Sequence, residues 1–199
     1  MSGDFFDWQR TPDGLVVTLA DVMGTSVGAA RIAATVRAAL RVASSALDPA
    51  RTPSVVDRAV EADLDANDAF VALLHMRLDV RTGEVALVDA GHGLSVVCRA
   101  DGTREAVPSR NLPLGVLGTQ EWSTTRLRLD PGDMLLVCSD GVLDLFDGTG
   151  DSMDTAARTA ADADRTAAAA VASLTRMATS TAPPDDVTVV AIRRAAAPL

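Results

Sequence analysis

The spacing of apolar residues changes from one segment of the 199-residue chain to the next. Residues 15–20 are a continuous apolar run of strand length. From residue 27 to about 47, and again from Pro53 to residue 67, apolar residues recur every three or four positions, as on one face of a helix. We therefore predict one strand followed by two helices, the first with Thr25 or Ser26 as its N-cap.

The middle of the chain carries β-strand patterns. Residues 70–80 and 84–90 are apolar or alternating, and the turn residues 81–83 between them predict a hairpin. Further strands are expected at 94–99, 124–129, 134–138 and 187–192, and one or two helices in the alanine-rich segment 151–180. Because the strands come in hairpins and the helices in separate blocks, this order indicates an α+β layered fold and not an alternating βαβ fold.

Composition narrows the class of protein. With 48% hydrophobic residues and no break in composition, the chain can form one sizeable core, so we predict a single domain over residues 1–199. The formal charge of −9 and the lack of a basic cluster argue against a nucleic-acid partner. No apolar run approaches the roughly 20 residues of a membrane span, and the N-terminus lacks a signal-peptide pattern, which predicts a cytoplasmic protein. Cys98 and Cys138 lie in apolar strand-like runs, as is typical of buried reduced thiols.

Aspartates follow two of the predicted strands. Asp21 comes directly after residues 15–20, and Asp140 follows the strand at 134–138, each close to a glycine that lets the backbone turn sharply. Mg²⁺ and Mn²⁺ prefer oxygen ligands and can take carboxylates from distant segments, so both positions are candidate metal ligands. Taken singly, an aspartate beside a glycine has a plain alternative, which is a hydrogen bond within a turn.

Two close acidic pairs add further candidates. Asp185 and Asp186 begin the last predicted strand, and Asp4 and Asp7 flank two phenylalanines. Successive side chains of a strand point to opposite faces, so at most one member of each pair can face a shared site. The other member is expected to cap the backbone or to form a local hydrogen bond.

Two further polar residues, Ser139 and His92, have both a catalytic and a structural interpretation. Ser139 could be a nucleophile, but no base partner is evident, and its place at a strand end favours a structural hydroxyl. His92 follows a strand-ending glycine, where an orienting hydrogen bond is more common than acid catalysis. His75 lies within a predicted strand, and we interpret it as a solvent-facing residue.

Seven short blocks follow one another over nearly the whole chain. They are Gly3-Asp4-Phe5-Phe6-Asp7, Asp21-Val22-Met23-Gly24, Asp89-Ala90-Gly91-His92, Leu112-Pro113-Leu114-Gly115, Pro131-Gly132-Asp133, Ser139-Asp140-Gly141-Val142 and Asp185-Asp186-Val187-Thr188. In this order they resemble the signature of the SpoIIE-like, RsbU-like branch of the metal-dependent protein phosphatases, the protein phosphatase 2C superfamily. Seven ordered blocks are far more specific than any one of them.

The resemblance implies a fold, a cofactor and a set of site residues. The fold would be a four-layer α-β-β-α sandwich of two antiparallel sheets flanked by helices, here lacking the usual first strand or strands. Two divalent cations, Mn²⁺ or Mg²⁺, would be bound, and a metal-bound water would be the only nucleophile. The implied ligands are Asp4, Asp21, the Val22 carbonyl, Asp140 and Asp185. The implied supporting residues are Asp7, Gly24, Gly141, Asp186 and His92.

The same resemblance implies a serine/threonine phosphoprotein phosphatase whose substrate is a phosphorylated anti-sigma-factor antagonist in bacterial partner switching. One departure supports a rival hypothesis. Thr25-Ser26 stands where relatives carry a basic or imidazole side chain, which suits a catalytically weak or inactive member that acts as a protein-binding regulatory module. A small-molecule phosphoesterase is a third alternative. The sequence leaves open whether the chain forms a homodimer.

Overall fold

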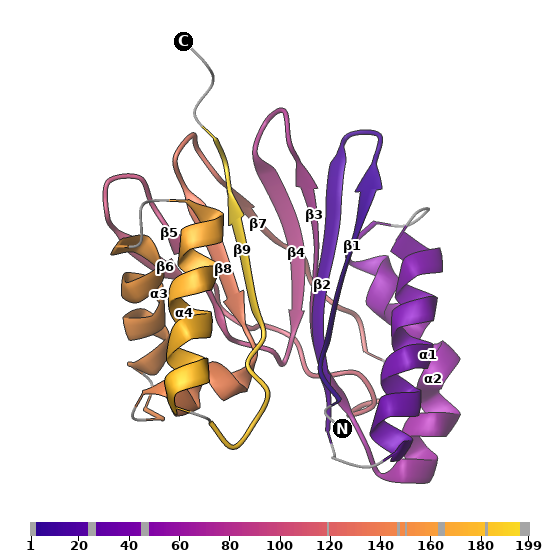
Figure 1. Ribbon diagram of the computed structural model, residues 1–199. Coiled ribbons are helices and arrows are strands. Elements are labelled where there is room, and N and C mark those ends of the chain that lie inside the picture. The colour runs from indigo at the N-terminus through magenta and orange to yellow at the C-terminus, as the bar shows by residue number, and fades with distance from the viewer. Residues whose placement is uncertain are drawn as a thin grey trace. The chain divides into compact units, whose positions relative to one another are not determined.

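The chain folds into two compact units, which Figure 1 shows in a computed structural model. The structure describes residues 3–23, 27–44, 48–118, 120–146, 148–149, 151–162, 166–181 and 183–195. The first unit comprises Met1–Gly93 and Ser109–Arg128, and the second comprises Leu94–Pro108 and Leu129–Leu199. The N-cap predicted at Thr25 or Ser26 lies outside the described residues, and the single domain over residues 1–199 stays a prediction.

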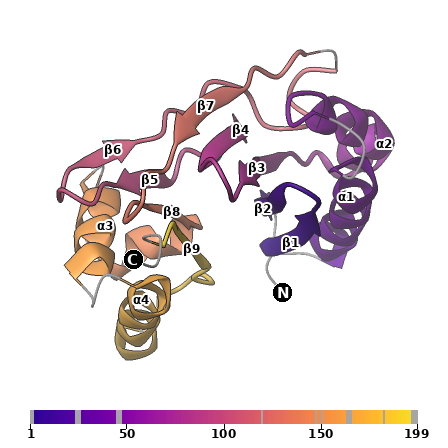
Figure 2. The same cartoon turned by 90° about the horizontal axis from the view of Figure 1, so that it is seen from above.

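The first unit is built on a five-stranded antiparallel sheet in the order β1-β2-β3-β4-β7. The strands are β1 (Phe5–Thr11), β2 (Gly14–Val22), β3 (Val71–Asp79), β4 (Glu84–Ala90) and β7 (Thr125–Arg128). Two helices, α1 (Val27–Ser44) and α2 (Arg51–Asn67), lie together on one face of this sheet (Figure 2). The predicted hairpin and both predicted helices are therefore present.

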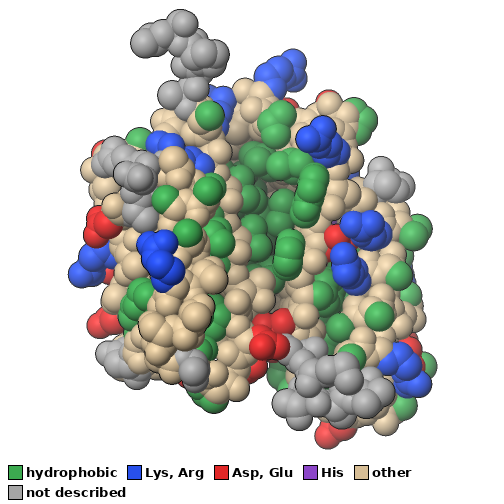
Figure 3. All heavy atoms as spheres, viewed as in Figure 1, with side chains coloured by type: hydrophobic (Ala, Val, Ile, Leu, Met, Phe, Trp, Pro, Cys, Tyr) green, Lys and Arg blue, Asp and Glu red, His purple; other side chains and the backbone are tan. Residues whose placement is uncertain are grey.

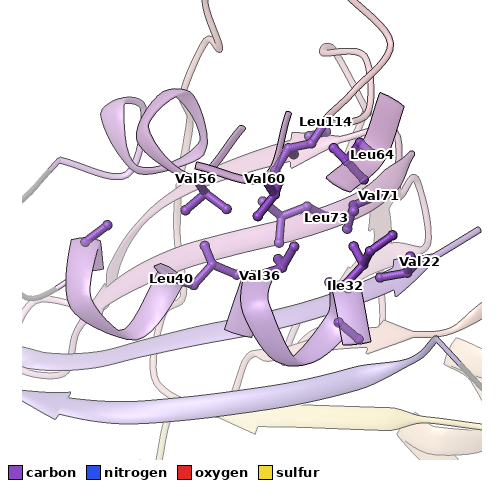
Figure 4. Close-up of a cluster of buried hydrophobic side chains, with 14 of the residues drawn as sticks. Val22, Ile32, Val36, Leu40, Val56, Val60, Leu64, Val71, Leu73 and Leu114 are labelled. Carbon is purple, nitrogen blue, oxygen red and sulfur yellow. The ribbon is translucent and has the colours of Figure 1, made fainter. Parts of the chain in front are cut away.

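Helical spacing explains the core of the first unit. Each helix places a buried apolar residue on the sheet at every fourth position, and Figure 4 shows these side chains converging on β2 and β3. They are Ile32, Val36 and Leu40 of α1, and Val56, Val60 and Leu64 of α2. Removing this apolar area from water is the main term that stabilises the helices against the sheet.

The second unit is built on a four-stranded antiparallel sheet in the order β6-β5-β8-β9. Its elements are β5 (Ser95–Cys98), β6 (Arg104–Ala106), β8 (Met134–Cys138), the 3-10 helix η1 (Asp140–Leu145), α3 (Ser152–Asp162), α4 (Ala167–Thr181) and β9 (Val189–Arg193). Helices α3 and α4 pack against the sheet through small and apolar residues. Cys98 and Cys138 are free and buried, as predicted, and burial raises the pKa of the Cys138 thiol to about 12.

The α+β class is confirmed, with two antiparallel sheets and flanking helices. The structure differs from the sequence prediction in three elements, of which the first is β1 (Phe5–Thr11), a strand that was not predicted. The short strand β6 was not predicted either, because Arg104–Ala106 is exposed and carries no apolar pattern. Strand β9 begins at Val189, so Asp185 and Asp186 precede the strand and the argument from side-chain alternation does not apply to them.

His75 contradicts the sequence interpretation, because it is buried and not solvent-facing. It lies on the central strand β3, opposite Thr18 of β2, and its ring faces α1. Its Nδ1 is 2.9 Å from the Thr18 hydroxyl, and its Nε2 is 3.4 Å from the hydroxyl of Ser44. Burial lowers the pKa of His75 to about 4, with a smaller contribution from the nearby charge of Arg77. The imidazole is therefore neutral at pH 7.

A buried carboxylate attaches the connection between β6 and β7 to helix α2. Asp57 Oδ1 accepts a hydrogen bond of 2.8 Å from the backbone N–H of Gly115. Gly115 has a φ of +85°, a conformation that favours glycine, and Leu114 beside it is fully buried. Burial raises the pKa of Asp57, and the Gly115 N–H opposes that rise.

We expect Asp57→Ala to lower the free energy of unfolding by about 0.5–1.5 kcal/mol, because it removes the hydrogen bond between the Gly115 N–H and the buried Asp57 side chain. Asp57→Asn should cost less, since the amide oxygen can accept the same hydrogen bond. Urea unfolding of both variants measures the difference. Equal losses in the two variants would contradict the assigned role of the Asp57 oxygen.

The helices and the charged side chains bear on two expectations from the sequence, that the chain has no membrane span and no basic cluster. Among the described residues, no helix is long and apolar enough to cross a membrane. On the face drawn in Figure 3, the described acidic and basic side chains are interspersed and do not form a single basic patch.

Candidate metal centre

The first pair of candidate ligands lies where β1 and β2 meet. Phe5 pairs with Ala20, so the antiparallel register continues with Asp4 opposite Asp21. Directly opposite residues of an antiparallel pair have side chains on the same face, with Cβ atoms roughly 5 Å apart. This face is opposite the one that carries α1 and α2, because Phe5 and Ala20 belong to the helix-covered core.

Gly3 makes this approach possible. The Val22 N–H donates a hydrogen bond of 3.4 Å to the Gly3 carbonyl, and a Cβ added at Gly3 would lie 2.2 Å from the Val22 carbonyl oxygen. Only glycine therefore fits beside Val22. The Gly3-Asp4 motif therefore brings the backbone of Asp4 next to Asp21 and Val22. As a result, the first two of the seven sequence blocks lie side by side.

Asp7 lies on the opposite face of β1 from Asp4. It is buried, and it accepts hydrogen bonds from the guanidinium groups of Arg41 and Arg37 on α1, with Arg41 Nη2 2.7 Å from Oδ1. The hydrogen bond from Arg41 is the largest influence on the pKa of Asp7 and, with Arg37, lowers it despite the opposing effect of burial. Asp7 thus attaches β1 to α1, and its contacts agree with a supporting role.

The second pair of motifs lies where β8 ends and the approach to β9 begins. Ser139 joins the two: its N–H donates to the Thr188 carbonyl at 2.9 Å, its hydroxyl donates to the Asp186 carbonyl at 3.1 Å, and it accepts from the Thr188 N–H at 2.9 Å. Asp140 is exposed at the start of η1. A Cβ added at Gly141 would lie 2.2 Å from the Asp186 carbonyl oxygen, so Gly141 permits this close contact.

These contacts make Ser139 a structural residue, as the sequence indicated. We expect Ser139→Ala to lower the free energy of unfolding by about 1–3 kcal/mol, because the Thr188 N–H loses its acceptor. Ser180→Ala, at an exposed hydroxyl of α4 in the same unit, should change it by less than about 0.5 kcal/mol. Urea unfolding compares the two. Unchanged stability of Ser139→Ala would contradict the structural role.

His92 belongs to a turn that Asp89 organises. The carboxylate of Asp89 is buried and accepts hydrogen bonds from the backbone N–H groups of His92, at 2.9 Å, and Gly93, at 3.0 Å. The side-chain amide of Asn111 donates to the Asp89 carbonyl at 2.9 Å. Sequence reasoning assigned Asp89 no role. The available signal was a strand-ending aspartate directly before Ala90-Gly91-His92.

The chemistry of the candidate ligands suits hard divalent cations, since each is a carboxylate or a backbone carbonyl. Each of the two motif pairs contains a glycine whose missing side chain brings two acidic segments together. Within the described part of the chain, no three His, Cys, Asp or Glu side chains form a group that could hold a metal ion. Gly24 lies outside the described residues. The ligand set therefore stays a prediction.

Solved structures with this fold include phosphatase domains. The structure titled as the RsbU and RsbW domains of Rv1364c from Mycobacterium tuberculosis is 27% identical, with a TM-score of 0.82, and the match covers 98% of this chain and 56% of that chain. The catalytic domain of the serine/threonine protein phosphatase PstP, solved with two manganese ions, has a TM-score of 0.70 at 19% identity, and the match covers 96% of this chain and 90% of that chain. The second likeness concerns the fold alone.

A family model described as Stage II sporulation protein E (SpoIIE) matches residues 11–195, and the chain belongs to this family of PP2C-type, metal-dependent phosphatases. Two curated relatives agree. The phosphoserine phosphatase RsbU of Bacillus subtilis is 24% identical over 144 residues, and Protein IcfG of Synechocystis sp. is 26% identical over 175 residues. The matches cover 71% and 72% of this chain but only 43% and 27% of those proteins.

Proposed function

We propose that the chain is a serine/threonine phosphoprotein phosphatase that depends on two Mn²⁺ or Mg²⁺ ions. The ligands in this proposal are Asp4, Asp21, the Val22 carbonyl, Asp140 and Asp185. The observation that carries it is the continued register of β1 and β2, which sets Asp4 opposite Asp21 in a chain of the SpoIIE family. Like charges directly opposite one another in an antiparallel pair are destabilising, and a cation shared between them would offset this repulsion.

The electrostatics of the substrate require such cations. A phosphate monoester dianion is repelled by carboxylates, so the site can bind it only when positive charge exceeds the charge of the ligands. Bound Mn²⁺ or Mg²⁺ would supply that charge and a water of lowered pKa that can attack phosphorus.

The chain's own residues would position the ligands. Gly3 brings Asp4 beside Asp21, and Asp7 attaches the same strand to α1. Ser139 and Gly141 connect the Asp140 turn to the backbone of Asp186. These contacts reduce the freedom of the carboxylates before any ion binds, which favours binding because less order has to be created.

The substrate in this proposal is a phosphorylated anti-sigma-factor antagonist of bacterial partner switching, acted on in the cytoplasm. The relative RsbU is named a phosphoserine phosphatase, and the similar Mycobacterium tuberculosis structure contains RsbU and RsbW domains. The first name supports a phosphoserine substrate, and the second supports a link to RsbW-type regulatory proteins.

The test is the release of inorganic phosphate from a phosphoserine protein of this class, with Mn²⁺ present and after its removal with EDTA. We expect release with Mn²⁺, loss of release with EDTA, and recovery when Mn²⁺ is returned in excess. Release at an equal rate with and without the metal would overturn metal dependence. No release under any of these conditions would favour the regulatory-module hypothesis that rests on Thr25-Ser26.

A further inference from the structure

Strand β9 forms one edge of the second sheet, and within the described residues no strand pairs with its outer side (Figure 1). All five residues of β9 are only partly buried, whereas all five residues of the neighbouring β8 are buried. Charged residues interrupt the other edge strands β1, β6 and β7, but Val189–Ile192 is an uninterrupted apolar run. Charged residues normally protect an edge strand, because its unpaired backbone is a template for another strand. Most of β9 lacks this protection.

Two backbone hydrogen bonds show which groups of β9 point away from the sheet. The Thr188 carbonyl accepts a hydrogen bond of 2.9 Å from the residue that follows β8, and the Arg194 N–H donates one of 3.0 Å to the residue that precedes β8. The backbone groups of successive strand residues point alternately to the two sides of the strand. The N–H and C=O groups of Val189, Ala191 and Arg193 therefore point to the open edge.

A shallow groove of small and apolar side chains lies between β9 and helix α4. It is lined by Ala191 and by one side of α4, which includes Ala168, Val171 and Ala172. Leu174 of the same helix does not line the groove and is fully buried in the core of the second unit. The side of α4 that lines the groove is therefore distinct from the side that packs on the sheet. An open strand edge and an uncovered helix side thus lie next to each other in one unit.

This edge is complementary to a second copy of itself. Two β9 strands can pair antiparallel about a two-fold axis through Val190, which sets Val189 of each copy opposite Ala191 of the other. Both of these residues point their backbone groups to the open edge, so each pair exchanges two hydrogen bonds. The same register brings the exposed Asp186 of each copy to Arg194 of the other, at both ends of the paired strands. Opposite charges therefore meet there, although the net charge of −9 on each copy opposes association at long range.

The two-fold pairing also covers the groove. Val189 and Ala191 both pack toward α3 and α4, so the two copies carry their α4 helices on the same face of the joined sheet. The helices then lie side by side across the axis, where the small side chains of Ala168 and Ala172 permit the spacing of about 8–10 Å that packed helices adopt. We propose that β9 and this side of α4 form a homodimer interface that joins the second sheets of two copies into one sheet. This inference does not depend on the proposed phosphatase activity.

Sedimentation equilibrium of the full chain over a range of concentrations measures the association. We expect the wild type to approach twice the mass of one chain as its concentration rises. Ala191→Pro removes an N–H that points only to the open edge, where proline is tolerated, and should raise the dissociation constant of the dimer by at least about tenfold. A wild type that stays monomeric at its highest soluble concentration would overturn the inference. An unchanged dissociation constant in folded Ala191→Pro would also overturn it.

A matched pair of α4 variants tests the groove and decides the matter if Ala191→Pro does not fold. Ala172→Glu places a charge in the groove and should weaken the dimer by at least about tenfold, because the charge would be buried without a partner. Thr179→Glu adds the same charge at an exposed position of α4 outside the groove and should leave the dimer unchanged. Circular dichroism and urea unfolding establish that each variant is folded. Equal dissociation constants for the two variants would overturn the interface.

A charge exchange tests the register of the two strands. Arg194→Asp should weaken the dimer, since it brings two acidic side chains together, and the double variant Asp186→Arg with Arg194→Asp should restore it. Hydrogen exchange at the Val189 and Ala191 amides should be slow in the dimer and faster after dilution. Equal association of Arg194→Asp and the wild type would overturn the pairing. Protection of these amides only when a phosphoprotein is added, without self-association, would assign the edge to that protein and overturn the homodimer. None of these readouts uses turnover, so they are independent of the phosphatase proposal.

Discussion

Asp140→Asn and Asp21→Asn are each expected to lower Mn²⁺-dependent phosphate release by at least about 100-fold. Each substitution keeps the size of the side chain and removes one negative charge from the proposed ligand set. Both aspartates are partly or fully exposed, so the exchange should leave the free energy of unfolding within about 1 kcal/mol of the wild type. The measurement is phosphate release from a phosphoserine protein at saturating and limiting Mn²⁺.

Asp144→Asn is the control for this prediction. Asp144 is exposed on η1, the same 3-10 helix that Asp140 begins, and it is not among the proposed ligands. Its exchange should leave the rate unchanged. Equal rates of phosphate release for the wild type, Asp21→Asn and Asp140→Asn would show that neither aspartate is a metal ligand needed for the reaction.

The second large effect concerns stability and pH. His75 has a pKa of about 4 in the folded chain and about 6.5 when unfolded, so the unfolded state binds more protons between these two values. The contribution of neutral His75 to the free energy of unfolding is therefore fully present above pH 6.5. It is lost as the pH falls toward 4, by about 3 kcal/mol if His75 acts alone. Asp57, whose pKa is raised by burial, acts in the opposite direction just above its ordinary pKa and offsets part of the loss.

Urea unfolding at a series of pH values between 4 and 7 measures this slope. In His75→Gln the slope between about pH 5 and 7 should largely disappear, because the buried imidazole is gone, whereas carboxylates with lowered pKa values such as Asp7 contribute only nearer pH 4. His92→Gln changes the only other histidine and should keep the slope of the wild type. If the slope persists in His75→Gln and disappears in His92→Gln, His92 is the group that titrates. That result would contradict the assignment to His75.

The elements of the fold could be predicted where spacing alone decides them. Helices α1 and α2 follow from apolar residues at helical intervals, and the β3–β4 hairpin follows from two apolar runs around a tight turn. Strand β6 could not be predicted, because its three residues are exposed and carry no alternating apolar pattern, and its pairing partner is β5. Its signal was the Asp101-Gly102 turn, which marks a hairpin but not the length of the returning strand.

The burial of His75 could not be predicted from the sequence of β3 alone. A histidine between apolar residues was interpreted as facing solvent, but β3 is the central strand of its sheet and a helix covers the face that His75 occupies. Burial of that face depends on α1, whose packing the local sequence of β3 does not contain. The partners Thr18 and Ser44 are 57 and 31 residues away in the chain, so only the tertiary fold supplies them.

The acidic motifs were found in the sequence, but their supporting contacts were not. Alternation applies to Asp7, which lies in the regular strand β1 and contacts α1, while the role predicted for Asp4 as a ligand stays a prediction. The same argument failed at Asp185-Asp186, which lies before β9, and there the backbone is ordered by Ser139 and Gly141 instead. Such contacts join segments more than 40 residues apart and leave no local pattern.

Calorimetric titration of the chain with Mn²⁺ tests the central claim most directly. The account predicts that the wild type binds two ions, and that Asp21→Asn and Asp140→Asn each weaken binding while Asp144→Asn does not. This readout is independent of the substrate and of turnover, so it separates a metal-dependent phosphatase from a protein-binding module. Absence of Mn²⁺ binding by the folded wild type would contradict the claim.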